Sequence, residues 1–149
     1  MGSNRETACE PSWFTCSYRV SYADCTVGNH VYYGRYAAIL EWARGEFFRS
    51  LEIPFLTLQN QGFLFPVIRL VIEYHKPARY DDLLRIDLCI TELRRAFLSF
   101  AYRISLAASP SSLIVEASTR HLCTDLEGRP RRIPKELLTR LTPYLCPSA

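Results

Sequence analysis

The sequence contains no hydrophobic run long enough to cross a bilayer, since no stretch approaches the ~20 apolar residues that a transmembrane helix needs. Residues 1–11 are polar and lack the apolar segment of a secretory signal. Both absences predict a soluble, cytoplasmic protein without a membrane partner. The chain has 149 residues, which suits a single domain over residues 13–149 after a flexible segment over residues 1–12.

Metal-binding side chains are few and scattered. The 6 cysteines form no C-x-x-C pair and the 3 histidines are far apart, whereas zinc ligands usually occur in close pairs. We therefore expect no metal, and nothing in the sequence implies another cofactor. An even cysteine count without a secretory signal does not predict disulfides. The cysteines are expected to stay reduced and to pack as small apolar groups.

Common catalytic signatures are also missing. The sequence has no G-x-S-x-G elbow, no phosphate-binding loop of the G-x-x-x-x-G-K-[ST] type and no H-E-x-x-H. These absences argue against a serine hydrolase, a P-loop nucleotidase and a zinc protease. The net charge of +3 is small and no nucleic-acid recognition motif accompanies it, so no nucleic-acid partner is expected. Such a charge suits an anionic substrate or an acidic carrier protein.

The chain is rich in hydrophobic residues, at 48%, and their spacing changes along it. Apolar residues recur every second position in five runs, which predicts strands. They recur every three or four positions over Tyr33–Leu51, which predicts an amphipathic helix. The predicted strands are Phe14–Tyr22, 68–74, 84–90, 98–106 and 113–123, and Lys135–Leu141 is a predicted short helix. The short links between the later strands favour an antiparallel sheet packed on one helix, an α+β fold.

The connector Leu51–Pro66 has two prolines and a glycine but is also rich in large apolar residues. A solvated loop has a different composition, so this connector is expected to pack over a pocket or an interface.

The polar segment Tyr22–Gly34 joins the first strand to the long helix and is the best candidate for a functional site. A helix start has free N–H groups and a partial positive charge, which polarise a carbonyl and hold an oxyanion. Asp24, Thr26, Asn29 and His30 precede this helix and are able to orient water. The alternative is an ordinary capping loop with turn-forming glycine and asparagine.

Several motifs in this order resemble the hot-dog-fold acyl-CoA thioesterases, above all the 4-hydroxybenzoyl-CoA thioesterase group and the thioesterases of the Tol–Pal gene cluster. They are Asp24-Cys25-Thr26, then His30-Val31-Tyr32-Tyr33, then the helix segment Glu41–Phe48 and the turn Tyr74–Asp82. The resemblance covers nearly the whole chain. It implies a sheet wrapped around a central helix, homodimers with a joined sheet or homotetramers, and a coenzyme A or acyl carrier protein thioester as the substrate.

One position departs from the family pattern. The family's second acidic residue acts as base or nucleophile, and Thr26 stands there, although a neutral threonine cannot act as a general base near pH 7. The related thioesterases of enediyne polyketide pathways resemble the chain here too, with asparagine at the Thr26 position and an arginine at Arg44. This resemblance implies that Thr26 holds the attacking water near Arg44 and that the Tyr33 N–H polarises the carbonyl. Asn29 and His30 complete the predicted catalytic set, with His30 as a base.

Other residues are predicted to contact the substrate, each with a plainer alternative. Glu41 is expected to face the pocket, or else to be a solvated or interface carboxylate. Arg94 and Arg95 suit the coenzyme A phosphates, or else form a solvated turn. Asp24 and Tyr32 lie beside the site, where Asp24 also has the right chemistry to accept backbone N–H groups and hold the loop.

Two other functions are compatible with the same residues. The first is hydrolysis with decarboxylation of a β-keto acyl chain on a carrier protein of polyketide biosynthesis. The second is a module that binds acyl thioesters but has lost turnover together with the family acid.

Overall fold

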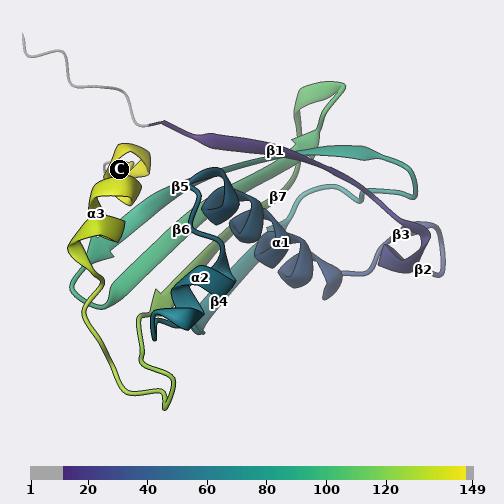
Figure 1. Cartoon of the computed structure of the whole chain (residues 1–149). Helices are drawn as coiled ribbons and strands as arrows, with labels where there is room; N and C mark the ends of the chain where they lie inside the picture. Colours follow the sequence, from purple (N-terminus) through teal and green to yellow (C-terminus); the bar gives the residue numbers. More distant parts are fainter. Residues whose placement is uncertain (1–11, 147–149) are drawn as a thin grey trace, which may run out of the picture.

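A computed structural model describes residues 12–146 of the chain. It consists of one antiparallel sheet in the order β1-β5-β6-β7-β4 with a long helix across one face (Figure 1). The strands are β1 (Phe14–Arg19), β4 (Val67–Tyr74), β5 (Leu83–Arg94), β6 (Phe97–Leu106) and β7 (Ser109–Leu122), and the helices are α1 (Arg35–Ser50), α2 (Phe55–Asn60) and α3 (Lys135–Leu141). The α+β class and the order of the main elements are as predicted. The flexible segment predicted at the N-terminus lies, up to residue 11, outside the described residues.

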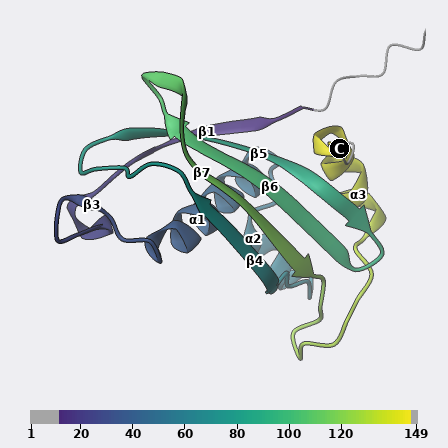
Figure 2. The same cartoon turned by 180° about the vertical axis from the view of Figure 1, so that it is seen from behind.

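The core lies between α1 and the sheet. Ile39, Leu40 and Phe47 on α1 are at most 1% exposed, as are Leu88 and Phe100 on the sheet. Each such side chain contributes about 1.5–3 kcal/mol by leaving water. The apolar stripe of α1 and the apolar face of the sheet therefore bury each other, as the sequence pattern predicts. Figure 2 shows the opposite face of the sheet, which no helix of the described residues crosses.

The first strand is shorter than predicted. β1 ends at Arg19, whereas the alternating pattern continues to Tyr22. Ser21 starts a single 3₁₀ turn, η1 (Tyr22–Asp24), because its N–H and its hydroxyl both donate to the Asp24 carboxylate, at 2.8 and 2.9 Å. Tyr22 is 83% exposed as a result. A side-chain hydrogen bond, which periodicity does not detect, ends this strand.

Regular structure extends beyond two predicted strands and into the connector. β5 continues to Arg94, past the predicted strand over 84–90, and a turn follows over the next two residues, where Arg95 has φ 54°. β7 already begins at Ser109, before the predicted strand over 113–123. The connector Leu51–Pro66 contains the short helix α2, which brings Leu58 into the core at 3% exposure.

β4 forms one edge of the sheet and pairs only with β7. Its apolar side chains are consequently open to solvent on both faces: Val67, Ile68, Leu70, Val71 and Tyr74 are between 37% and 50% exposed. A long apolar edge strand is a surface that proteins usually cover or pair. None of the helices in the described region is long and apolar enough to span a membrane.

Candidate active site

The predicted loop forms a two-stranded hairpin before α1. β2 (Cys25–Thr26) pairs with β3 (His30–Val31), with Thr26 opposite His30. The tip needs left-handed backbone at Gly28, with φ 91°, and at Asn29, with φ 54°, and glycine and asparagine are the residues that tolerate it. The turn chemistry of the sequence therefore places Thr26 and His30 side by side on the strands.

Asp24 ties this hairpin to the rest of the domain. Its side chain is 1% exposed and accepts hydrogen bonds from Tyr18 Oη at 2.9 Å and Arg35 Nε at 2.6 Å, besides the two from Ser21. Burial alone would raise the pKa of the Asp24 carboxyl, but these donors outweigh it and hold the pKa below its ordinary value. With its oxygens occupied, Asp24 has the position of a residue that holds the loop, not one that contacts a substrate.

Asn29 lies at the hairpin tip, apart from the pocket described next. Its side-chain oxygen accepts from the Tyr80 N–H at 3.3 Å, and its carbonyl accepts from Arg79 Nη1 at 3.3 Å. These bonds attach the tip to the turn that follows β4. The amide is engaged in the fold, so its place does not suggest contact with a reacting water.

A cavity of about 550 Å³ opens at the start of α1. Thr26, His30, Tyr32 and Tyr33 line it, together with Val31, Tyr36, Tyr74, His75, Lys76 and Pro77. Four of the predicted site residues therefore share one cavity.

At the start of α1, a backbone carbonyl is hydrogen-bonded, whereas two backbone N–H groups are free. The Tyr74 hydroxyl donates to the Tyr33 carbonyl at 2.9 Å. The N–H groups of Tyr33 and Gly34, in contrast, donate to no other residue within the described range. Free N–H donors at a helix start are suited to polarising a carbonyl.

A second cavity, of about 310 Å³, lies between the middle of α1 and the sheet. Glu41 and Arg44 on α1 line it, and much of the remaining wall comes from the connector. Its aromatic lining consists of Phe48, Phe55, Phe63, Phe65 and Phe100. The expectation that the connector packs over a pocket is confirmed.

A chain of buried polar side chains runs along the wall of this second cavity. Arg44 Nη1 donates to the Tyr102 hydroxyl at 3.0 Å, Tyr102 is 2.8 Å from the Thr119 hydroxyl, and Thr119 is 2.9 Å from His121 Nε2. His121 Nδ1 lies 2.9 Å from the Phe65 carbonyl. A guanidinium only donates and a carbonyl only accepts, so Arg44 donates to Tyr102, and His121 carries a proton on Nδ1 that it donates to Phe65.

His121 is suited to the neutral state by its surroundings. Burial, reinforced by the positive charge of Arg44, lowers the pKa of His121 to about 4. Tyr102, Thr119 and His121 were not predicted as site residues. The signal was present, since Thr119 and His121 continue the alternation of a buried strand face, where polar residues are uncommon.

The thioesterase superfamily matches residues 28–109. The acyl-CoA thioester hydrolase YbgC of Escherichia coli is 36% identical over 126 residues, which cover 84% of this chain and 92% of that protein. The chain belongs to the thioesterase superfamily. A 1,4-dihydroxy-2-naphthoyl-CoA thioesterase from Synechocystis superposes with a TM-score of 0.81 at 25% identity, covering 88% of this chain and 96% of that one.

The hot-dog fold predicted for this thioesterase is thereby confirmed. The resemblance to the enediyne branch is supported only in part. The dynemicin thioesterase superposes with a TM-score of 0.81 over 93% of this chain and 99% of its own, but at 13% identity, which shows the fold alone. The roles implied for Thr26 and Arg44 stay predictions.

Within one copy of the thioesterase, the predicted catalytic residues are divided between the two cavities. Thr26, His30 and Tyr33 line the first, and Arg44 lines the second. The cavities lie at opposite ends of β4: the first is bounded by Tyr74 and the residues after it, and the second by Val67 and the residues before it. A strand of 8 residues spans about 25 Å.

Arg94 ends β5 and Arg95 begins the β5–β6 turn, and neither lines a cavity. Arg94 is 80% exposed at its side chain, 3.9 Å from the Glu92 carboxylate. The turn is at the same end of the sheet as the second cavity, because the Cys123 N–H after β7 donates to the Ala96 carbonyl at 2.6 Å.

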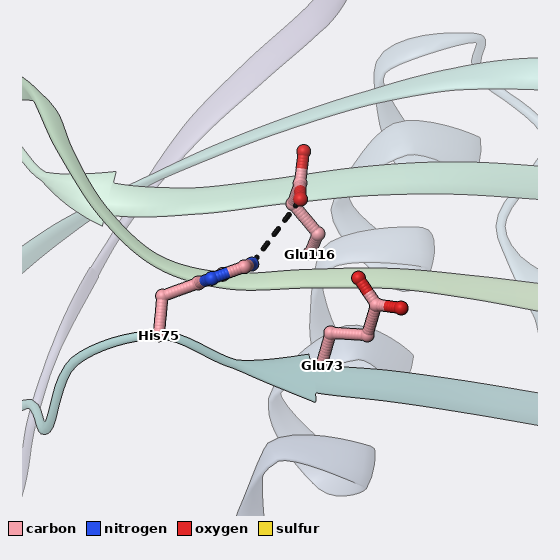
Figure 3. Close-up of side chains that lie close together, drawn as sticks. All are labelled: Glu73, His75 and Glu116. Carbon is pink, nitrogen blue, oxygen red and sulfur yellow. Dashed lines mark hydrogen bonds and ion pairs between the residues drawn. The ribbon is translucent and has the colours of Figure 1, made fainter.

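The outer face of the sheet has a charged cluster at the edge of the first cavity, which His75 lines. Glu73 on β4 and His75 just after it lie beside Glu116 on β7, with His75 Nε2 3.2 Å from a Glu116 oxygen (Figure 3). Their potential ligand atoms lie within 4.8 Å of one another. Arg103 Nη2 is 3.6 Å from the other Glu116 oxygen, and all of these side chains are at least partly exposed. The arrangement is that of a solvated ion-pair cluster.

Proposed function

We propose that this thioesterase hydrolyses acyl thioesters of coenzyme A, with water as the attacking group. The observation that carries the proposal is the first cavity, which Tyr33, with its free N–H at a helix start, lines together with Thr26 and His30. The similarity to an acyl-CoA thioester hydrolase over most of the chain supports the same chemistry.

The roles follow from the groups available. The Thr26 hydroxyl holds the water, and the Tyr33 N–H donates to the thioester oxygen as negative charge develops on it. Water adds to the carbonyl carbon, its proton passes to His30, and collapse of the tetrahedral intermediate breaks the C–S bond. His30 then returns the proton to the leaving thiolate. Tyr32 forms part of the wall that excludes bulk water.

The working unit is proposed to be a homodimer joined through β4. Two β4 edges that pair antiparallel about a two-fold axis place the end of one strand beside the start of the other. The first cavity of one copy then adjoins the second cavity of its partner. Such a dimer reunites Thr26 and Tyr33 with Arg44 and Glu41, which about 25 Å of β4 separates in one copy. Arg94 and Arg95, at the end of the sheet that carries the second cavity, are proposed to contact the coenzyme A phosphates.

A panel of thioesters tests the function. Straight-chain and aromatic acyl groups, each on coenzyme A and on an acyl carrier protein, are offered to the purified protein, and thiol release is measured. Hydrolysis of coenzyme A thioesters is expected, with kcat/KM at least tenfold lower in Thr26→Ala and in Arg44→Ala. If both variants match the wild type, the proposed site is wrong.

The same panel separates the alternatives. Product masses distinguish simple hydrolysis from hydrolysis with loss of CO₂ when the chain is a β-keto acyl group on a carrier protein. Tight binding of acyl-CoA without any thiol release would indicate a binding module. In that case Thr26→Asp, which restores the family's acidic residue, would be expected to produce turnover.

A further inference from the structure

Arg44 is a charged residue in an unusual place. Only 7% of it is exposed, and no ion pair joins it to a carboxylate anywhere in the described part of the chain. Its hydrogen-bond partner among the described residues is the neutral Tyr102 hydroxyl, at 3.0 Å from Nη1. A guanidinium keeps its charge in proteins, and burying a charge is unfavourable unless an opposite charge compensates it.

The uncompensated side of Arg44 opens onto the second cavity. No buried side-chain nitrogen in the described residues lacks a partner, so the Nε and Nη2 atoms, which bond to no described residue, must reach the cavity that Arg44 lines. Glu41 is the one carboxylate on that wall, and it is exposed at the rim without an ion pair to Arg44. The cavity therefore has free donors in a mostly aromatic enclosure.

The proposed dimer does not supply the missing charge either. The side chains that line the first cavity, which the dimer places next to Arg44, are those of threonine, valine, proline, tyrosine, histidine and lysine. None is acidic, and Lys76 adds positive charge. Asp24, the nearest acid in the hairpin, is buried and bonded to Arg35.

We infer that the second cavity takes an acyl group that itself bears a carboxylate, the monothioester of a dicarboxylic acid, with the carboxylate on Arg44. The inference rests on the proposed thioester hydrolysis. Two parallel N–H groups of a guanidinium match the two oxygens of a carboxylate. The methylenes of the chain would contact Phe48, Phe55 and Phe100, so the carboxylate is the one group of the chain inside this cavity that needs a polar partner.

The test compares acyl groups of equal length with and without the charge. Hydrolysis of adipoyl-CoA and hexanoyl-CoA is measured, with succinyl-CoA and glutaryl-CoA locating the best chain length. The wild type is expected to prefer the best dicarboxylic thioester over its uncharged counterpart by at least tenfold in kcat/KM. Arg44→Met is expected to lower both rates, because Arg44 belongs to the proposed site, and to reverse the ratio between them.

Two further variants keep the test independent of folding defects. Arg49→Met alters an exposed arginine on the same helix, paired with Glu46, and should leave the preference unchanged. Tyr102→Phe removes the hydrogen bond that orients Arg44 and should weaken the preference mainly through KM, since the charge remains.

The outcomes separate the inference from the function beneath it. Faster hydrolysis of hexanoyl-CoA than of every dicarboxylic thioester overturns the inference and leaves the hydrolase intact. A preference for 3-oxohexanoyl-CoA over both overturns it in favour of a neutral acceptor. If no thioester is hydrolysed, the function fails, and binding of S-hexyl-CoA against its 5-carboxypentyl analogue of equal length, measured by calorimetry, decides the inference alone.

Discussion

At the scale of single residues, burial separates the polar side chains that build the site from those that open into it. Asp24 and Thr119 are each at most 3% exposed and are bonded within the fold. Thr26 and His30 are exposed to the first cavity. Replacing a buried, bonded group alters stability, whereas replacing an exposed one alters what the cavity binds.

The burial of His121 predicts how the free energy of unfolding depends on pH. The folded protein binds its proton near pH 4, whereas the unfolded chain does so near 6.5. Between these values the unfolded state binds more protons, so the free energy of unfolding decreases as the pH falls. The loss should approach about 3 kcal/mol by pH 4, and His121→Gln should show a flatter curve than the wild type in urea unfolding at pH 7, 6, 5 and 4.

Carboxylates also titrate near pH 4, so the comparison between proteins matters more than either curve. Leu126→Gln is the control, because Leu126 is 56% exposed and the change neither adds nor removes a titratable group, so its curve should parallel the wild type. Parallel curves for His121→Gln and the wild type would show that His121 is not held neutral in the fold.

At the scale of elements, spacing alone predicted α1 and the five strands of the sheet, because these segments bury one continuous face. It did not predict α2, a helix of 6 residues that is too short to be stable alone and depends on contacts such as Phe55 with Phe48, 5.2 Å between ring centroids. Nor did it predict the chain from Arg44 to His121. That chain joins α1, β6 and β7 through strand register, which a single sequence does not contain.

Helix α1 contains Gly45 near its middle, and the structure gives it no steric reason. A Cβ there would meet only the Phe55 ring, at 3.6 Å, which is an ordinary contact. Glycine costs about 1 kcal/mol relative to alanine inside a helix. Gly45→Ala is therefore expected to stabilise the protein by about 0.5–1 kcal/mol in chemical unfolding.

The same substitution elsewhere provides the control. Gly128 has open space around it but a φ of 84°, so Gly128→Ala should destabilise by about 1 kcal/mol through backbone strain alone. A loss of stability in Gly45→Ala would mean that α1 and α2 pack too closely there to admit a methyl group.

At the scale of the whole molecule, each copy has an exposed apolar edge at β4 and a divided site, and pairing through β4 would resolve both. Val71 faces the outer side of the sheet at the middle of that edge, paired with Ser118, and is 37% exposed. Two copies of β4 related by a two-fold axis would bring their central residues together. Val71→Lys would then place two like charges at the joint without altering either cavity.

The expected result is a monomer by light scattering and a loss of thioester hydrolysis of at least tenfold, because Thr26 and Arg44 no longer meet. Leu126→Lys is the control, since Leu126 is 56% exposed in a turn outside the sheet, and it should keep both the dimer and the activity. Circular dichroism of Val71→Lys should match the wild type if only association is lost. A monomeric Val71→Lys with full activity would show that one copy holds a complete site, and the division of the residues along β4 would then have no catalytic meaning.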